Sequence, residues 1–96
     1  MPFQISLDKK IHKQLPKLPK KIQNRFQSTI DEIGENPYDG KPLKYKLKRY
    51  HSWRIGDYRV IYEILAQESI IKIKAVGHRK NIYDIIRRLM AILFSI

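Results

Sequence analysis

The sequence predicts an α+β fold in which an N-terminal αα-hairpin packs on a small, mostly antiparallel sheet and a C-terminal helix follows. Three patterns lead to this prediction. Apolar residues recur at helical spacing in the first third of the chain, alternate with polar residues between 52 and 76, and return to helical spacing after 81. The chain has 96 residues, 43% of them apolar, which suits one core of modest size. We therefore expect a single domain over residues 1–96.

The first elements are a short strand and two helices. Residues 3–7 suit a strand, and Ser6 is placed to cap a helix that ends at Pro16. A second helix starts with Pro19 in its first turn and ends at Gly34. The second helix carries an apolar stripe of Ile22, Phe26, Ile30 and Ile33. We expect the stripe to lie in the core, although a partner-binding face would show the same pattern.

Charge restricts the kind of partner. The chain holds 20 Lys and Arg against 9 Asp and Glu, a net charge of +11 at pH 7, which favours a polyanion. Nucleic acid, an anionic membrane surface and an acidic protein all remain candidates. The absence of cysteine excludes disulfides and thiolate metal sites and fits a reducing cytoplasm. The longest apolar run, residues 89–94, is far short of the roughly 20 needed to span a bilayer, so we expect a soluble, cytoplasmic protein.

The stretch "WRIGDYRVIY", residues 53–62, predicts a β-hairpin and its register. A two-residue Gly56-Asp57 turn pairs Arg54 with Arg59, and a second turn at Gln67-Glu68 adds a third strand. These registers predict one almost wholly apolar face, made of Trp53, Ile55, Tyr58, Val60, Tyr62, Ile64, Ile71, Ile73 and Ala75. The opposite face would hold Ser52, Arg54, Arg59, Ile61, Glu63, Lys72, Lys74 and Val76. A slip of one residue would exchange the faces, so the clean sorting supports this register.

The pairing of Arg54 with Arg59 opposes folding, because like charges directly opposite on a sheet cost about 0.2–1 kcal/mol. A phosphate group would explain the pair, since two guanidinium groups can bind its oxygens through charge-assisted hydrogen bonds. The alternative is that both side chains extend into water.

The turn after the third strand holds further candidates. His78 and Arg79 end the strand, Asn81 suits a helix cap, and Tyr83 lies in the first helical turn. If this turn folds across the basic face, an imidazole, a third guanidinium and a phenol join the arginine pair. Such a set suits general acid/base chemistry on a phosphodiester. Packing by Tyr83 and an exposed loop position for His78 are the simpler alternatives.

A second basic region precedes the hairpin. Residues 41–54 contain six Lys and Arg residues and no acidic residue, and three aromatic residues alternate with them. Such mixtures suit RNA, because bases stack on rings while phosphates meet cations. The candidate RNA-binding residues are Arg54, Lys46, Lys48, Arg49, Lys72 and Lys74. A solvated loop beside a core containing the aromatics is the alternative.

Two long segments resemble the RelE/ParE superfamily of toxin-antitoxin toxins. They are "LKRYHSWRIGDYRVIYEI", residues 47–64, and "IKIKAVGHRKNIYDIIRRL", residues 71–89. The likeness covers nearly the whole chain, and the central "GDYRVIY" is also typical of ParE-like gyrase inhibitors. The motif "GHRKNIYD", with a tyrosine four residues after an arginine, favours the RelE-type ribosome-associated mRNA endonucleases.

The resemblance implies a role for each matching residue. Arg59 would hold the scissile phosphate, Arg79 would stabilise the developing charge, and Tyr83 would take part in proton transfer. Some RelE proteins carry two catalytic lysines spaced two apart on the preceding strand, where this chain reads "YHSWRI". The general base is therefore open. The substitutes are Lys46, Lys48, His51 and His78, and the register turns His51 toward the core.

The reaction expected from the resemblance is cleavage of mRNA on the ribosome. Because the RNA's own 2′-hydroxyl is the nucleophile, the reaction needs orientation, proton transfer and charge stabilisation, and we expect no metal or cofactor. A cognate antitoxin is the implied protein partner, and the apolar stripe of the C-terminal helix, which Met90, Phe94 and Ile96 widen, would suit it. A ParE-like gyrase inhibitor and a non-catalytic RNA-binding module are the alternatives.

Overall fold

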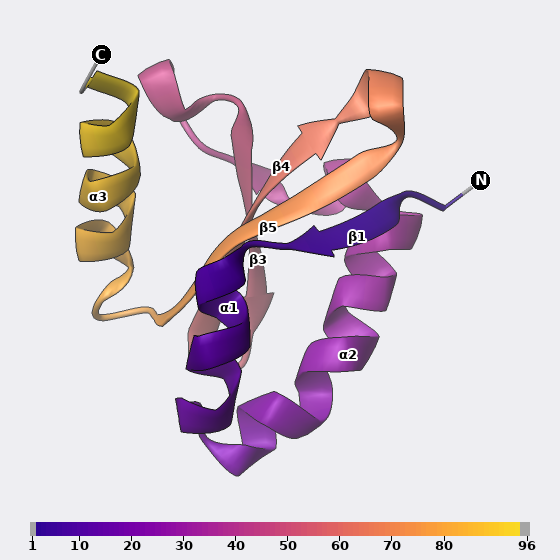
Figure 1. Cartoon of the computed structure of the whole chain (residues 1–96), viewed down its shortest axis with the longest axis vertical. Coiled ribbons are helices and arrows are strands. Elements are labelled where there is room, and N and C mark those ends of the chain that lie inside the picture. Colours follow the sequence, from indigo (N-terminus) through magenta and orange to yellow (C-terminus); the bar gives the residue numbers. More distant parts are fainter. Residues whose placement is uncertain (1, 95–96) are drawn as a thin grey trace.

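Five strands form one open sheet in the order β1-β5-β4-β3-β2. This computed structural model describes residues 2–94, apart from the side chains of Met90 and residues 92–94. The strands are β1 (Gln4–Leu7), β2 (Lys41–Pro42), β3 (Tyr50–Ile55), β4 (Tyr58–Leu65) and β5 (Ile70–His78). β1 pairs with β5 in parallel, and the other pairs are antiparallel, which confirms the predicted mostly antiparallel sheet (Figure 1).

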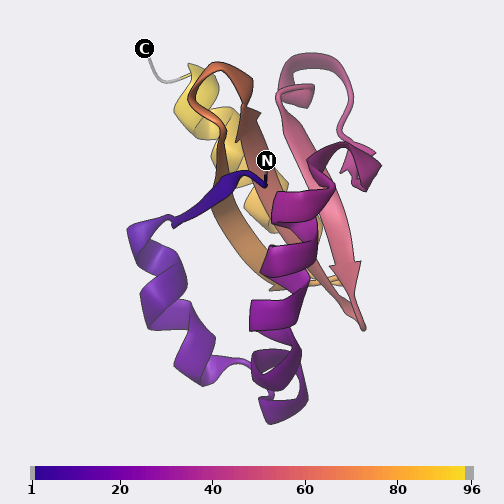
Figure 2. The same cartoon turned by 90° about the vertical axis from the view of Figure 1, so that its right-hand side faces the viewer.

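Helices cover both faces of this sheet. They are α1 (Lys9–Gln14), α2 (Lys20–Glu35) and α3 (Ile82–Phe94), with short 3-10 turns between elements, namely η1 (Leu15–Lys17), η2 (Pro37–Asp39), η3 (Tyr45–Leu47) and η4 (Ala66–Glu68). Figure 2 shows α2 in front of the strands and α3 behind them. None of the helices in the described part of the chain is long and apolar enough to cross a membrane.

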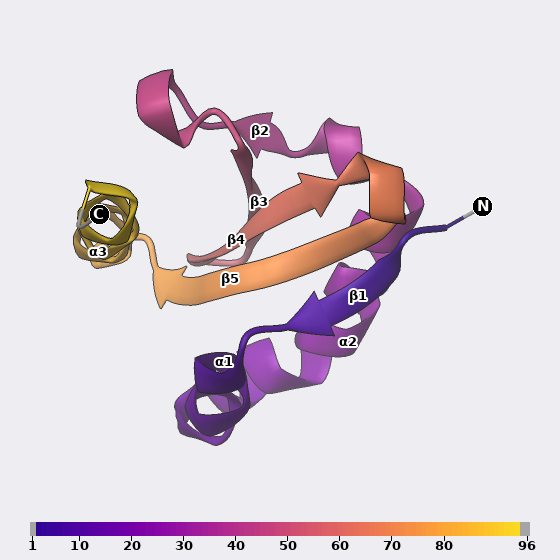
Figure 3. The ribbon, with the colours of Figure 1, turned by 45° about the horizontal axis from the view of Figure 1, so that its top comes forward.

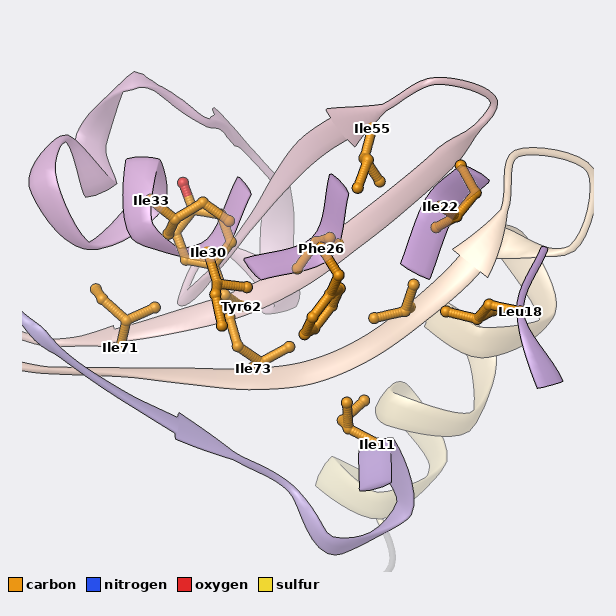
Figure 4. Close-up of a cluster of buried hydrophobic side chains, with 12 residues drawn as sticks. Ile11, Leu18, Ile22, Phe26, Ile30, Ile33, Ile55, Tyr62, Ile71 and Ile73 are labelled. Atoms are coloured by element: carbon orange, nitrogen blue, oxygen red, sulfur yellow. The ribbon is translucent and has the colours of Figure 1, made fainter. Parts of the chain in front are cut away.

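The predicted α2 stripe lies in the main core. Its members Ile22, Phe26, Ile30 and Ile33 are all buried, and they pack on the sheet residues Ile55, Val60, Tyr62, Ile71 and Ile73 (Figure 4). Burying a side chain of this size contributes about 1.5–3 kcal/mol, so the stripe holds the helix to the sheet. The prediction of a core position is confirmed.

The start of α1 differs from the prediction. Ser6 lies inside β1, and Asp8 is the residue that precedes the helix, with an extended backbone and no side-chain cap among the described hydrogen bonds. The reason is the pairing of β1 with β5. Hydrogen bonds from the Gln4 N–H to the Ser69 carbonyl (2.9 Å) and from the Asp8 N–H to the Ile73 carbonyl (3.1 Å) keep the chain extended through Ser6.

The predicted hairpin register is correct for all four predicted pairs between β3 and β4, including Arg54 with Arg59. Between β4 and β5 it holds as far as the pair of Tyr62 and Ile73, where a bulge shifts it. Ile61 then pairs with Ala75, so Lys74 has no partner on β4 and the residues that follow change faces. Val76 packs in the main core and Ala75 on the opposite side, which reverses their predicted positions.

A second, smaller core lies between α3 and the other face of the sheet. It contains the buried residues Leu47, Tyr50, Ile61, Ala75, Ile82 and Leu89. Gly77 belongs to this contact, because a Cβ there would collide with Ile85 Cδ1. The basic face predicted from the alternation is therefore partly covered by a helix. Of the C-terminal apolar residues, Met90, Ile92, Leu93, Phe94 and Ile96 lie outside the side chains that the structure describes.

Candidate functional site

Three arginines come from chain segments that meet at one end of the sheet. Arg54 and Arg59 face each other across β3 and β4, two residues from the Gly56-Asp57 turn. Arg79 follows β5, and its backbone N–H donates to the Asp57 carbonyl at 2.8 Å. That hydrogen bond ties the end of β5 to the hairpin turn. We call Arg54, Arg59 and Arg79 the arginine cluster.

The three members of the arginine cluster differ in exposure. Arg54 and Arg79 are exposed, whereas Arg59 is half-buried. The Nε atom of Arg54 donates to the Gly56 carbonyl at 3.2 Å, so this side chain bends toward the turn. Because Arg59 pairs with Gly77, two residues before Arg79, both arginines lie at the same end of the sheet. The arrangement offers guanidinium groups to an anion approaching this end.

His78 lies on the opposite face from Arg59. It pairs with Tyr58, and the two rings meet edge to face with centroids 5.2 Å apart on the α2 side of the sheet. The Nδ1 atom of His78 accepts a hydrogen bond from the Lys80 N–H at 3.1 Å, which in the neutral ring leaves the proton on Nε2. His78 thus holds the strand-to-helix turn, and the structure does not bring its ring beside Arg59.

Tyr83 lies in the first turn of α3 and is 70% exposed. The helix starts after Asn81, as predicted, because the Asn81 carbonyl accepts hydrogen bonds from the N–H groups of Asp84 (3.1 Å) and Ile85 (3.3 Å). A carboxylate at Asp84 is also favourable at the helix N-terminus. The phenol is therefore open to a ligand bound near Arg79, four residues earlier.

The other predicted RNA-binding residues lie away from the arginine cluster. Arg49 Nε contacts Glu63 Oε2 at 3.3 Å, and Lys72 pairs with Glu63 across the strands, toward the other end of β4. Lys46 and Lys48 are exposed in and after η3. Ile61, which is buried under α3, lies between this region and Arg59. The predicted set thus divides into two separate regions.

Lys74 has a structural partner in Asp8. Its Nζ lies 3.5 Å from Asp8 Oδ2, and it joins the bulge in β5 to the start of α1. Burial raises the pKa of Asp8, but the nearby charges of Lys74 and Lys10 and hydrogen bonds to the carboxylate outweigh burial and hold the pKa below its ordinary value. We therefore assign Lys74 a role in joining two elements.

The aromatic residues of the basic segment are mostly part of the structure. Tyr50 is buried, Trp53 packs against the main core, and Tyr45 is 88% exposed. His51 stacks on Tyr62 with ring centroids 5.5 Å apart, and burial lowers its pKa. The predicted orientation of His51 toward the core is confirmed, so Tyr45 is the residue of this set best exposed for stacking on a base.

The site contains groups that the sequence did not single out. The Asp57 carbonyl anchors Arg79, and Tyr58 packs on His78. The hairpin turn is the sequence signal for Asp57, whereas the pairing of Tyr58 with His78 depends on the bulge in β5. In the described part of the chain, no group of three or more His, Asp or Glu residues is arranged to hold a metal ion.

Solved structures of similar fold include toxin-antitoxin complexes. The chain matches the toxin-antitoxin complex RelBE2 of Mycobacterium tuberculosis with a TM-score of 0.74 and 28% identity, covering 81% of this chain and 99% of that one. The archaeal RelE-RelB complex of Pyrococcus horikoshii matches with a TM-score of 0.70 and 29% identity, over 82% of this chain and 97% of that one. The class of protein is thus a toxin of a toxin-antitoxin system.

Sequence comparison gives the family. Residues 5–83 match the family model described as the ParE toxin of the type II toxin-antitoxin system parDE. Toxins RelE and RelG of Mycobacterium tuberculosis are each 31% identical to this chain, over 85% and 86% of it and 87% and 98% of their own lengths. The chain belongs to the RelE/ParE superfamily of type II toxin-antitoxin toxins.

Proposed function

We propose that this toxin is a metal-independent endoribonuclease that cleaves mRNA on the ribosome, acts in the cytoplasm and is neutralised by a cognate antitoxin. The observation that carries the proposal is the arginine cluster, in which the chain segments of two paired strand arginines and of a third arginine from the β5–α3 turn meet at one end of the sheet. The RelE names of the relatives and of the matching structures support it, and so do the antitoxins in those complexes. The whole activity would reside in one domain.

In the proposed reaction the 2′-hydroxyl of the substrate attacks the adjacent phosphorus, and the bond to the 5′-oxygen of the next nucleotide breaks. The 2′-oxygen loses a proton and the leaving 5′-oxygen gains one. Arg59 and Arg54 hold the scissile phosphate, and Arg79 stabilises the negative charge that develops on its oxygens. Tyr83, exposed on the first turn of α3, serves the proton transfer.

The proposal is tested on translating ribosomes. Purified toxin should create new mRNA ends, mapped by primer extension, and Arg59→Ala or Arg79→Ala should reduce cleavage by about 10²–10³. Lys80→Ala is the matched control, because Lys80 is an exposed cation beside Arg79 that contributes only its backbone N–H to the described hydrogen bonds. Absence of new ends with folded wild-type toxin would contradict the proposal.

A second candidate function is inhibition of DNA gyrase, as in ParE toxins. The observation in its favour is the match to the ParE toxin family model over residues 5–83. A supercoiling assay with purified gyrase separates the two functions. Loss of supercoiling without mRNA cleavage supports the second candidate, and binding of RNA without either effect supports a non-catalytic RNA-binding module.

A further inference from the structure

A basic groove lies between α1 and α3, on the side of β5 that β1 leaves uncovered. β1 pairs with β5 only as far as the pair of Leu7 and Ile73, so the last part of β5 has a strand, β4, on one edge only. Figure 3 shows α1 and α3 on either side of this end of β5. Two adjoining hollows of about 300 and 430 Å³ open there. They share Gln14, Lys17, Ile85 and Arg88 in their walls.

The groove has a cationic rim and an apolar floor. Lys10, Lys13 and Lys17 form one wall, Arg88 stands on the other, and Ala75 and Val76 lie at the bottom of the first hollow. Three and four residues separate the lysines, which places them on one side of α1 and the turn after it. Gln14 Nε2 donates to the Val76 carbonyl, so a side chain satisfies a backbone group at the open edge of β5 and fixes α1 in place.

Lys10 lies near the Asp8 carboxylate, whereas the other three rim cations are poorly neutralised. Among the ion pairs of the described residues, which are Arg49 with Glu63, Lys74 with Asp8 and Arg87 with Asp84, none includes Lys13, Lys17 or Arg88. The first hollow has no carboxylate in its wall, and the Asp84 carboxylate in the second lies 3.3 Å from Arg87 Nη1. Like charges gathered around a hollow repel one another and oppose folding, so a bound anion would reduce this repulsion.

The groove also leads to Arg54, one member of the arginine cluster. The second hollow reaches Tyr58 and His78, the residue before Arg79. A third hollow, of about 440 Å³, shares Tyr58 and His78 with it and continues to Arg25 and Arg54. Adjoining hollows therefore connect the α1 lysines with Arg54, whereas Arg59 and Arg79 line none of the three.

We propose that this basic groove binds the phosphate backbone of single-stranded RNA that extends beyond the scissile phosphate. The inference rests on the proposed function for its substrate, but its own content is a second RNA contact on α1 and α3. Continuity with Arg54 favours RNA over an acidic protein segment, because a chain cleaved at the arginine cluster must leave it in some direction. Along this path the Lys and Arg side chains outnumber the two carboxylates, Asp84 and Asp57. The apolar floor accommodates ribose and base surfaces between the charged rims.

The test measures binding of a fluorescent 2′-O-methyl oligouridylate of about twelve nucleotides by anisotropy at several salt concentrations. This probe lacks the nucleophilic hydroxyl, so the result does not depend on cleavage. The triple variant Lys10→Gln, Lys13→Gln and Lys17→Gln should lower the slope of log K against log salt by about 2, since each phosphate contact to a single strand contributes about 0.7. Gln keeps the helix propensity, and circular dichroism checks the fold.

The matched control removes the same charge elsewhere, with Lys9→Gln, Lys20→Gln and Lys41→Gln, three exposed lysines outside the hollows. Equal slopes for the two triple variants would overturn the proposal. A groove variant that loses affinity for poly-L-glutamate more than for the oligouridylate would assign the groove to an acidic protein segment and also overturn it. If the groove variant shows the reduced slope while wild-type toxin cleaves no mRNA, RNA binding by the groove is supported and the nuclease proposal is refuted.

Discussion

The opposed arginines Arg54 and Arg59 should repel each other enough to be measured as a loss of stability. They are direct cross-strand partners, and like charges in that position cost about 0.2–1 kcal/mol. Arg54 is exposed and its Nε is hydrogen-bonded to Gly56, so we expect a value in the lower half of this range. Arg54→Gln and Arg59→Gln each remove one charge.

The assay is a double-mutant cycle on the free energy of unfolding, measured with urea for the wild type, both single variants and the double variant. The cycle cancels the packing that each side chain loses alone, which matters because Arg59 is half-buried. We expect a repulsive coupling of about 0.2–0.6 kcal/mol at low salt. In about 1 M salt, where the Debye length is about 3 Å, the coupling should nearly vanish.

RNA binding should change in the opposite direction to stability in these variants. Each single variant should weaken binding of RNA while relieving repulsion in the folded protein, which is the behaviour expected where function opposes stability. An attractive or salt-independent coupling would refute the reasoning, because it would mean that the guanidinium groups stack or face away from each other without cost. The pair would then be an ordinary feature of the sheet surface.

Three further outcomes follow from the core and from the ion pair at the bulge. Gly40→Ala should lower the free energy of unfolding by about 2–5 kcal/mol in urea titrations. The new Cβ would lie 2.9 Å from Tyr62 Cζ and disrupt the buried hydrogen bond (2.6 Å) that the Tyr62 hydroxyl donates to the Pro37 carbonyl. A loss under about 1 kcal/mol would contradict this reasoning. Burial raises the pKa of Tyr62 from 10.0 to about 12. The free energy of unfolding should therefore fall by about 2–3 kcal/mol as the pH rises from 10 toward 12. In Tyr62→Phe this decrease should be absent. Asp8→Asn should lower the free energy of unfolding by up to about 1 kcal/mol at pH 7. The loss should shrink as the pH falls below 3.8, since the Asp8 pKa is lowered in the folded protein. An equal loss at pH 7 and below pH 3.8 would exclude the ion pair with Lys74 as its cause.

The elements predicted best from the sequence are those fixed by local pattern. The α2 stripe and the hairpin around Gly56 follow from spacing and turn chemistry, because one side of each must be buried and a slip would expose it. The bulge at Lys74 could not be predicted in this way. Since helices cover both faces there, Ala75 and Val76 are buried in either register, and alternation carries no information about which face each residue takes.

The candidate site could also be predicted only where a local pattern determines it. Arg54 and Arg59 follow from the hairpin, but the side of the sheet on which His78 lies depends on the bulge, which changes the faces of all later residues in β5. The α1 lysines of the basic groove show helical spacing in the sequence, yet nothing local places them beside Arg88. That neighbourhood arises because β1 ends early and lets α1 approach the edge of β5.

The parallel pairing of β1 with β5 has a consequence for the order of folding. Gln4 is the partner of Ile70, so the first strand is synthesised long before the segment that completes its hydrogen bonds. Contacts of such sequence separation form late, because a long loop must close before they stabilise anything. During translation the N-terminal strand and α1 cannot pack in their final positions until β5 has left the ribosome. The basic groove, which needs α1 against β5, should therefore be among the last parts of the toxin to form.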